Sequence, residues 1–153
     1  MKQGSFYFAL NILFYAMVTG VILFALVAAF LVTSEQFLTD PSLGKILVPV
    51  AVVLAGSNVF LSDLLFKNQV KRINKTQPLY TRQSTYRSGF ILMMALLEGA
   101  ALFAIVTYLL SGSIIAMLSA AAVWGWMTLN RPSVDSLKKY LHLSSEEEMQ
   151  MFG

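Results

Sequence analysis

The sequence predicts an all-α integral membrane protein with four transmembrane helices, arranged as two hairpins, and a short amphipathic helix after them. Three observations lead to this fold class. The chain is 57% hydrophobic and only 12% charged, which is about half the charged fraction of an ordinary soluble domain. Its apolar residues form long blocks and do not alternate with polar ones. Several blocks approach the roughly 20 residues that cross a bilayer core.

Four apolar blocks are read as membrane spans. The first is too long for the apolar region of a signal peptide and has no convincing small-residue cleavage site, so we expect it to be retained. Pro132 either stops the last span or starts a new helix, and it separates the spans from a tail. The expected spans are about 6–32, 45–66, 88–110 and 112–130, with a transmembrane domain over 1–131 and a cytoplasmic tail over 132–153.

Local signals mark both ends of the second span. Thr39-Asp40-Pro41 offers an N-cap followed by a proline in the first helical turn. Near the other end, Asp63 and Lys67 are four residues apart, a spacing that permits an ion pair on one helix face. We interpret this pair as an ordinary interfacial ion pair, not as part of a transport path.

The basic residues gather in one connecting segment. Between residues 67 and 87 the chain has six Lys or Arg and no acid, whereas the turn over 34–44 has two acids. Short loops rich in Lys and Arg stay in the cytoplasm. We therefore expect both termini of this multi-pass membrane protein to be cytoplasmic. Because the basic residues lie between apolar blocks, they do not indicate nucleic-acid binding.

The tail shows a second helical pattern. Val134, Leu137 and Leu141 share one helix face with two lysines beside it. This pattern suits a short helix lying on the inner membrane surface or against the cytoplasmic end of the bundle. Ser144 and Glu147 have the spacing of a capping box, and a second such pair follows one residue later. A final short helix is therefore expected, with a solvated polar tail as the alternative.

One ionisable side chain lies inside an apolar block. Glu98 is about ten residues in from the basic edge of its span, near the middle of a bilayer. A charge at that depth costs at least ~2.5–3 kcal/mol, so such a residue normally faces protein or a wet cavity. No Lys or Arg lies at the same depth. Because burial disfavours the ionised form, we expect Glu98 to be mostly protonated near neutral pH.

The other spans are small or weakly polar at this depth, and two accounts stay open. In the first, Glu98 is a structural residue that hydrogen-bonds to a neutral side chain in a closely packed bundle, since small residues let transmembrane helices approach. In the second, the same side chains form a proton or cation site. The site candidates are Glu98, Asn58, Ser57 and Thr19, and the packing candidates are Gly20, Gly56, Ala95 and Gly99.

The segment MALLEGAALFAIVTYLL, Met94–Leu110, resembles the outer helix of the ring-forming c (proteolipid) subunits of rotary ATPases. Those helices carry Ala-Leu-x-Glu-Ala or Glu-Gly within an apolar run, and Glu98 matches their ion-binding carboxylate. The resemblance implies cation or proton binding at Glu98 and assembly of several copies. The inner helix of that family carries a run of glycines, whereas here 50–61 contains only Gly56.

Two further resemblances concern the whole chain. The LLEGAALF core, the RPS turn and the Leu-x-Leu-Ser-x-x-Glu tail resemble small uncharacterised four-helix membrane proteins of Bacteroidota, which implies a fold and no function. The small multidrug transporters are similar in size and number of spans. Their essential glutamate lies in the first helix, however, and Phe6–Val32 contains no acid.

Catalysis is poorly supported by the residues present. The chain has no cysteine, which excludes disulfides and thiolate metal sites, and its single histidine, His142, cannot build a metal site alone. No cofactor is expected. The resulting hypothesis is a small helical-bundle protein of a bacterial inner membrane, in contact with lipid, that self-associates or serves as an accessory subunit of a membrane complex and carries a buried, protonatable Glu98 at mid-membrane. The alternative is translocation of a proton, a cation or a small solute through Glu98.

Overall fold

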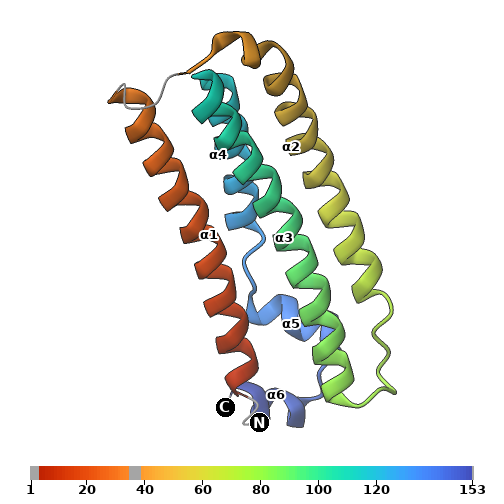
Figure 1. Ribbon diagram of the computed structural model, residues 1–153. Coiled ribbons are helices and arrows are strands. Elements are labelled where there is room, and N and C mark those ends of the chain that lie inside the picture. Colours follow the sequence, from red (N-terminus) through yellow and green to blue (C-terminus); the bar gives the residue numbers. More distant parts are fainter. Residues whose placement is uncertain (1–3, 35–38, 153) are drawn as a thin grey trace.

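The computed structural model describes residues 4–34 and 39–152, and every regular element in these ranges is an α-helix. Four helices run alternately up and down as a bundle, and two short ones lie at the end where the first helix begins (Figure 1). The helices are α1 (Gly4–Thr33), α2 (Pro41–Val70), α3 (Leu79–Ser111), α4 (Ile114–Leu129), α5 (Val134–Leu141) and α6 (Ser145–Phe152).

Three of these helices, α1, α2 and α3, are long and apolar enough to cross a membrane. The fourth, α4, is apolar but has only 16 residues. At 1.5 Å per residue it is about 24 Å long, somewhat less than the ~30 Å of a bilayer core. The architecture is that of an all-helical membrane bundle with three long apolar helices and a shorter one.

The predicted N-cap of α2 is confirmed. The Asp40 side chain accepts a hydrogen bond of 2.8 Å from the backbone N–H of Ser42, and Pro41 occupies the first turn. The ion pair at the other end is also formed, because Lys67 Nζ lies 2.6 Å from Asp63 Oδ2. The helix extends past the predicted span of 45–66 at both ends, since helical hydrogen bonding continues into the polar flanks.

The fourth helix lies within the predicted span of about 112–130, and Gly112 belongs to the end of α3. Its φ of 67° is in the left-handed region, and its N–H donates a 2.7 Å hydrogen bond to the Tyr108 carbonyl. Glycine adopts this conformation without a Cβ clash and so ends the helix. The next helix begins at Ile114 and stops at Leu129.

The central helix of the bundle is α3. In its most apolar stretch of 18 residues, 50% of the residues are buried, compared with 17% in the corresponding stretch of α1 and 11% in that of α2. It packs against α1, α2, α4 and α5. Its fully buried side chains are mostly apolar and include Phe90, Met94, Leu97, Ala101 and Ile105.

The apolar face of α5 packs against the end of the bundle, which is one of the two placements predicted for it. Leu137 and Leu141 are completely buried. The Tyr140 ring lies edge-on to Phe66 of α2, with 5.7 Å between ring centroids, and 6.3 Å from Tyr86 of α3. The short helix is therefore a docked structural element, because its apolar side chains complete the core at this end.

Candidate functional site around Glu98

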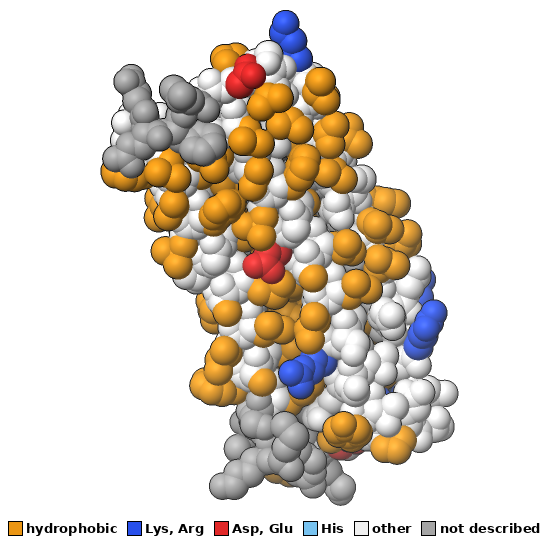
Figure 2. Space-filling view, in the orientation of Figure 1, with side chains coloured by type: hydrophobic (Ala, Val, Ile, Leu, Met, Phe, Trp, Pro, Cys, Tyr) orange, Lys and Arg blue, Asp and Glu red, His pale blue; other side chains and the backbone are white. Residues whose placement is uncertain are grey.

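Glu98 lies half-buried on the central helix, at a seam between α3 and α1. Its carboxyl oxygen Oε1 is 3.9 Å from the point that a Cβ would occupy on Gly20 of α1. The carboxyl group therefore lies against the backbone of α1 at Gly20, at an ordinary van der Waals distance from where a side chain would begin. Figure 2 shows this face as mostly apolar, with charged side chains toward the ends and an acidic one midway. Since Gly20 is itself exposed, the seam opens to the outside of the bundle.

The three predicted hydrogen-bond partners do not meet this carboxyl in the described chain. Asn58 Nδ2 donates to the Leu54 carbonyl at 2.9 Å, and Ser57 Oγ to the same carbonyl at 3.2 Å. Thr19 is exposed on α1. Polar side chains inside a helix often bond back to their own backbone in this way, which removes the need for an interhelical partner. Among residues 4–34 and 39–152, no group hydrogen-bonds to Glu98.

The predicted small residues have unequal surroundings. Gly20 meets the Glu98 carboxyl, whereas a Cβ added at Gly56 or Gly99 would find no atom within 4 Å. Ala95 is exposed as well. Among the described residues, these three positions show no close contact between helices, and their predicted role in helix packing stays a prediction.

Close approach between helices occurs instead at a glycine that the sequence did not single out. A Cβ on Gly89 of α3 would lie 3.1 Å from Gln69 Cβ of α2. That distance is shorter than ordinary carbon contacts of about 3.5–4.0 Å. The absence of a side chain at Gly89 therefore lets α2 and α3 come together near the end that carries α5.

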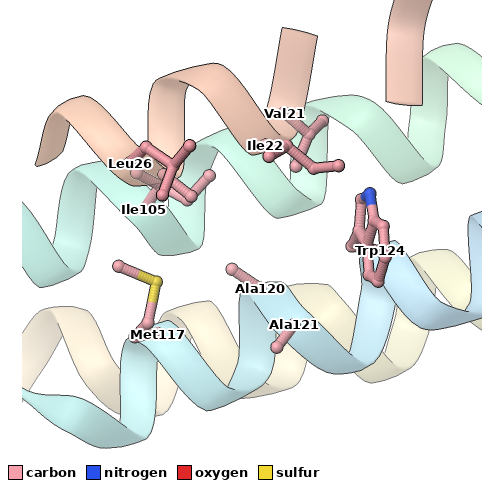
Figure 3. Close-up of a pocket in the computed structure, with 9 residues that line it drawn as sticks. Val21, Ile22, Leu26, Ile105, Met117, Ala120, Ala121 and Trp124 are labelled. Atoms are coloured by element: carbon pink, nitrogen blue, oxygen red, sulfur yellow. The ribbon is translucent and has the colours of Figure 1, made fainter. Parts of the chain in front are cut away.

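An apolar cavity of about 280 Å³ lies between α1, α3 and α4. On α1 its lining begins at Val21, and Glu98 is not among the residues that line it. In Figure 3 side chains of α1 face those of α4 across the cavity, and Trp124 stands at one end. The indole N–H of Trp124 is buried without a hydrogen-bond partner among the described residues. The lining residues are Val21, Ile22, Ala25, Leu26, Ile105, Met117, Ala120, Ala121 and Trp124.

A buried arginine at the other end of α3 was missed by the sequence analysis, which counted it only as a loop charge. Arg82 is 5% exposed. Its Nε donates to the Gln77 carbonyl at 3.1 Å, and Nη1 donates to the carbonyls of Leu141 at 2.6 Å and His142 at 3.3 Å. Its Nη2 forms an ion pair with Glu147. One guanidinium thus satisfies the C-terminal carbonyls of α5 and holds the first turn of α6.

The predicted capping box before α6 is confirmed at Ser144 and Glu147. The Ser144 N–H donates to Glu147 Oε2 at 2.9 Å, and the Glu147 N–H donates to Ser144 Oγ at 3.3 Å. The Ser144 backbone N–H and, after it, the Arg82 guanidinium hold the pKa of Glu147 below its ordinary value of 4.5. Glu148 does not cap the helix and pairs with Lys138 of α5, with 2.8 Å between the charged atoms.

The reactions open to Glu98 are those of a single carboxyl group. Within the described parts of the chain, no three His, Cys, Asp or Glu side chains converge as a metal-binding group. An unpaired carboxyl can exchange a proton, accept one cation, or hydrogen-bond to a group from another molecule. No known protein family, curated protein or solved structure matches the chain.

Proposed function

We propose that this protein is a subunit of an assembly in a bacterial inner membrane, and that the face carrying Glu98 contacts another transmembrane chain. The proposed partner is a second copy of the same chain. The observation that carries the proposal is the Glu98 carboxyl, which is half-buried midway along an apolar helix and has no described hydrogen-bond partner. Inside a bilayer an unsatisfied polar group costs several kcal/mol. A group supplied by a neighbouring chain would remove that cost.

The surroundings of Glu98 suit a helix from a neighbour. Ala95 and Gly99 are exposed on the same stretch of α3, and no atom of the described residues lies within 4 Å of the point that a Cβ would occupy on Gly99. Small residues let two transmembrane helices approach closely. Together these features make a contact surface with one polar group at its centre.

The proposed topology has four spans, with α5 and α6 in the cytoplasm. It is supported by the six Lys or Arg between residues 67 and 87. It is also supported by the fold, in which α1 begins and α6 ends at the same end of the bundle (Figure 1).

Translocation of a proton, a cation or a small solute through Glu98 is the second candidate function. It is favoured by the carboxyl itself, because an ionisable group without a described partner, midway along an apolar helix, can bind and release a proton or a cation. A carrier of this kind needs the carboxyl to ionise during its cycle. A purely structural contact needs only its hydrogen bonds.

Two substitutions at Glu98 separate these functions. Glu98→Gln keeps shape and hydrogen bonding but cannot ionise, whereas Glu98→Leu removes both. The assembly proposal expects the parent and Glu98→Gln to form a complex of the same mass in mild detergent, and Glu98→Leu to dissociate. Measurement is by light scattering across a dilution series. If the parent is monomeric at all concentrations, or if Glu98→Leu assembles like the parent, the proposal is wrong.

Transport is measured in the same preparations after reconstitution into vesicles. Proton or cation flux that is present in the parent and abolished by Glu98→Gln would favour the carrier. Equal behaviour of parent and Glu98→Gln would leave assembly as the role of this carboxyl. A carbodiimide that attacks protonated carboxyls gives a third measurement, since a Glu98 covered by another chain should react more slowly than one in a dissociated chain.

A further inference from the structure

A second cavity, of about 130 Å³, lies at the end of the bundle that carries α5. Its inner wall is apolar, and its rim is polar and includes both an acid and a base. The walls come from α2, α3, α5 and the end of α4. The lining residues are Asp63, Phe66, Tyr86, Phe90, Met93, Leu129, Asn130, Arg131, Ser136 and Tyr140.

Tyr86 is a buried tyrosine that lines this cavity. The residue is 2% exposed, and its ring stacks on Phe90 and meets Phe66 edge-on, with centroid distances of 6.5 Å and 5.6 Å. No hydrogen bond joins its hydroxyl to any described group. Buried tyrosine hydroxyls normally have a partner. The hydroxyl is therefore available to an acceptor that occupies the cavity.

The charge left over at the rim is positive. The carboxylate of Asp63 is neutralised by Lys67, which lies 2.6 Å away. Arg131 is exposed and pairs with no described carboxylate. A guanidinium offers several donors in a planar fork that matches the oxygens of a phosphate group. The Tyr86 hydroxyl as a hydrogen-bond donor and the positive charge of Arg131 together favour an anion in this cavity.

The position of the cavity indicates where that anion comes from. Leu129, in the last turn of α4, lines the cavity and is 78% exposed. The opening is therefore next to the apolar outer surface, at the point where α4 ends and the basic Arg131 follows. Phospholipid phosphates lie at this boundary between the bilayer core and water, and basic pockets between transmembrane helices bind lipid head groups.

We propose that this cavity binds the phosphate group of a membrane phospholipid. Arg131 pairs with the phosphate at the rim, and the Tyr86 hydroxyl donates to it from within. The acyl chains lie along the exposed surface of α4. A cavity of about 150 Å³ accommodates benzene, so a space of about 130 Å³ takes the phosphate with a small head group and no sugar. The site is separate from Glu98 and does not depend on the function proposed for it.

The test measures phospholipid binding to delipidated full-length protein in detergent by native mass spectrometry. The probe is dioleoyl phosphatidylglycerol, and dioleoylglycerol is the matched lipid without phosphate. The parent should bind the phospholipid at low stoichiometry and not the diacylglycerol. Loss of a hydrogen bond to a charged group should weaken binding by about tenfold or more in Arg131→Gln and in Tyr86→Phe. Arg87→Gln, which removes another exposed charge of the same end without a described partner, should bind like the parent.

Several results would overturn the proposal. Equal binding of the phospholipid and the diacylglycerol would show that only the acyl chains are held. Equal weakening in Arg87→Gln and Arg131→Gln would show a diffuse charge effect. Full displacement by millimolar inorganic phosphate would assign the site to a soluble anion. If Tyr86→Phe fails to fold, Arg131→Gln still decides the outcome, because its side chain is exposed.

Discussion

Replacing Arg82 with glutamine should release α5 and α6 from the end of the bundle. The buried guanidinium donates to the carbonyls of Gln77, Leu141 and His142 and pairs with Glu147. A glutamine is too short to reach all four groups. The substitution therefore leaves the last carbonyls of α5 and the first turn of α6 without their shared donor.

The size of the effect follows from the burial of each partner. Removing one member of a buried ion pair costs about 3–5 kcal/mol. The Glu147 side chain is 25% exposed and can be partly solvated after the change. We therefore expect the opening of this region to become easier by about 2–4 kcal/mol, which is roughly a 30- to 700-fold increase in the open population.

Hydrogen exchange measured by mass spectrometry reports this opening directly. Peptides that cover 134–152 should exchange faster in Arg82→Gln by roughly that factor, while peptides from the middle of α3 should not change. Arg82→Lys should be intermediate, because it keeps the charge but loses the planar fork. Arg87→Gln is the control, since Arg87 is exposed and has no described partner. If exchange over 134–152 in Arg82→Gln stays within a few-fold of the parent, the structural role given to Arg82 is wrong.

Three other perturbations have definite expected results. Gly89→Val should lower the free energy of unfolding by about 1–3 kcal/mol, because the added side chain would force α2 and α3 apart. Gly56→Ala is the control: a Cβ there would lie in open space, so the free energy of unfolding should be unchanged or slightly higher. The pKa of Glu147 is held below 4.5 in the folded protein, so its contribution to α6 docking should be complete above pH 4.5 and lost as the pH falls through the lower pKa of the folded state. Hydrogen exchange of peptides covering 145–152, measured as a function of pH, tests this. The Glu147→Gln variant should show a flatter dependence of exchange on pH. Reporter fusions should read cytoplasmic at Asn74 and external at Gly112, and a reversed pair would overturn the proposed orientation.

The parts of the fold that the sequence predicted depend on neighbouring residues. The Asp40 cap, the Asp63–Lys67 pair and the Ser144–Glu147 capping box each join groups two to four residues apart, so the spacing alone specifies the geometry. The apolar blocks predicted the three long helices and the shorter α4 for the same reason. Their exact ends were harder to predict, because Gly112 suits both the end of one helix and the start of the next.

The parts that could not be predicted depend on contacts far apart in the chain. Arg82 and Leu141 are 59 residues apart, and nothing in a charge count separates this buried arginine from the exposed Arg87. The neighbours of Glu98 were inferred from depth alone, which fixes a level in the bilayer but not the direction of a side chain around its helix. Asn58 and Ser57 lie at a similar level and bond to their own helix.

Cross-linking in native membranes tests most directly whether the Glu98 face contacts another chain. Because the protein has no cysteine, Ala95→Cys introduces a single thiol on that face, and Val53→Cys, at a position 67% exposed on α2, is the matched control. With a short bismaleimide, Ala95→Cys should give a product of twice the monomer mass, and adding Glu98→Leu should reduce it. Val53→Cys should remain monomeric. The proposed contact would be contradicted if only Val53→Cys gave a dimer, or if neither variant gave one.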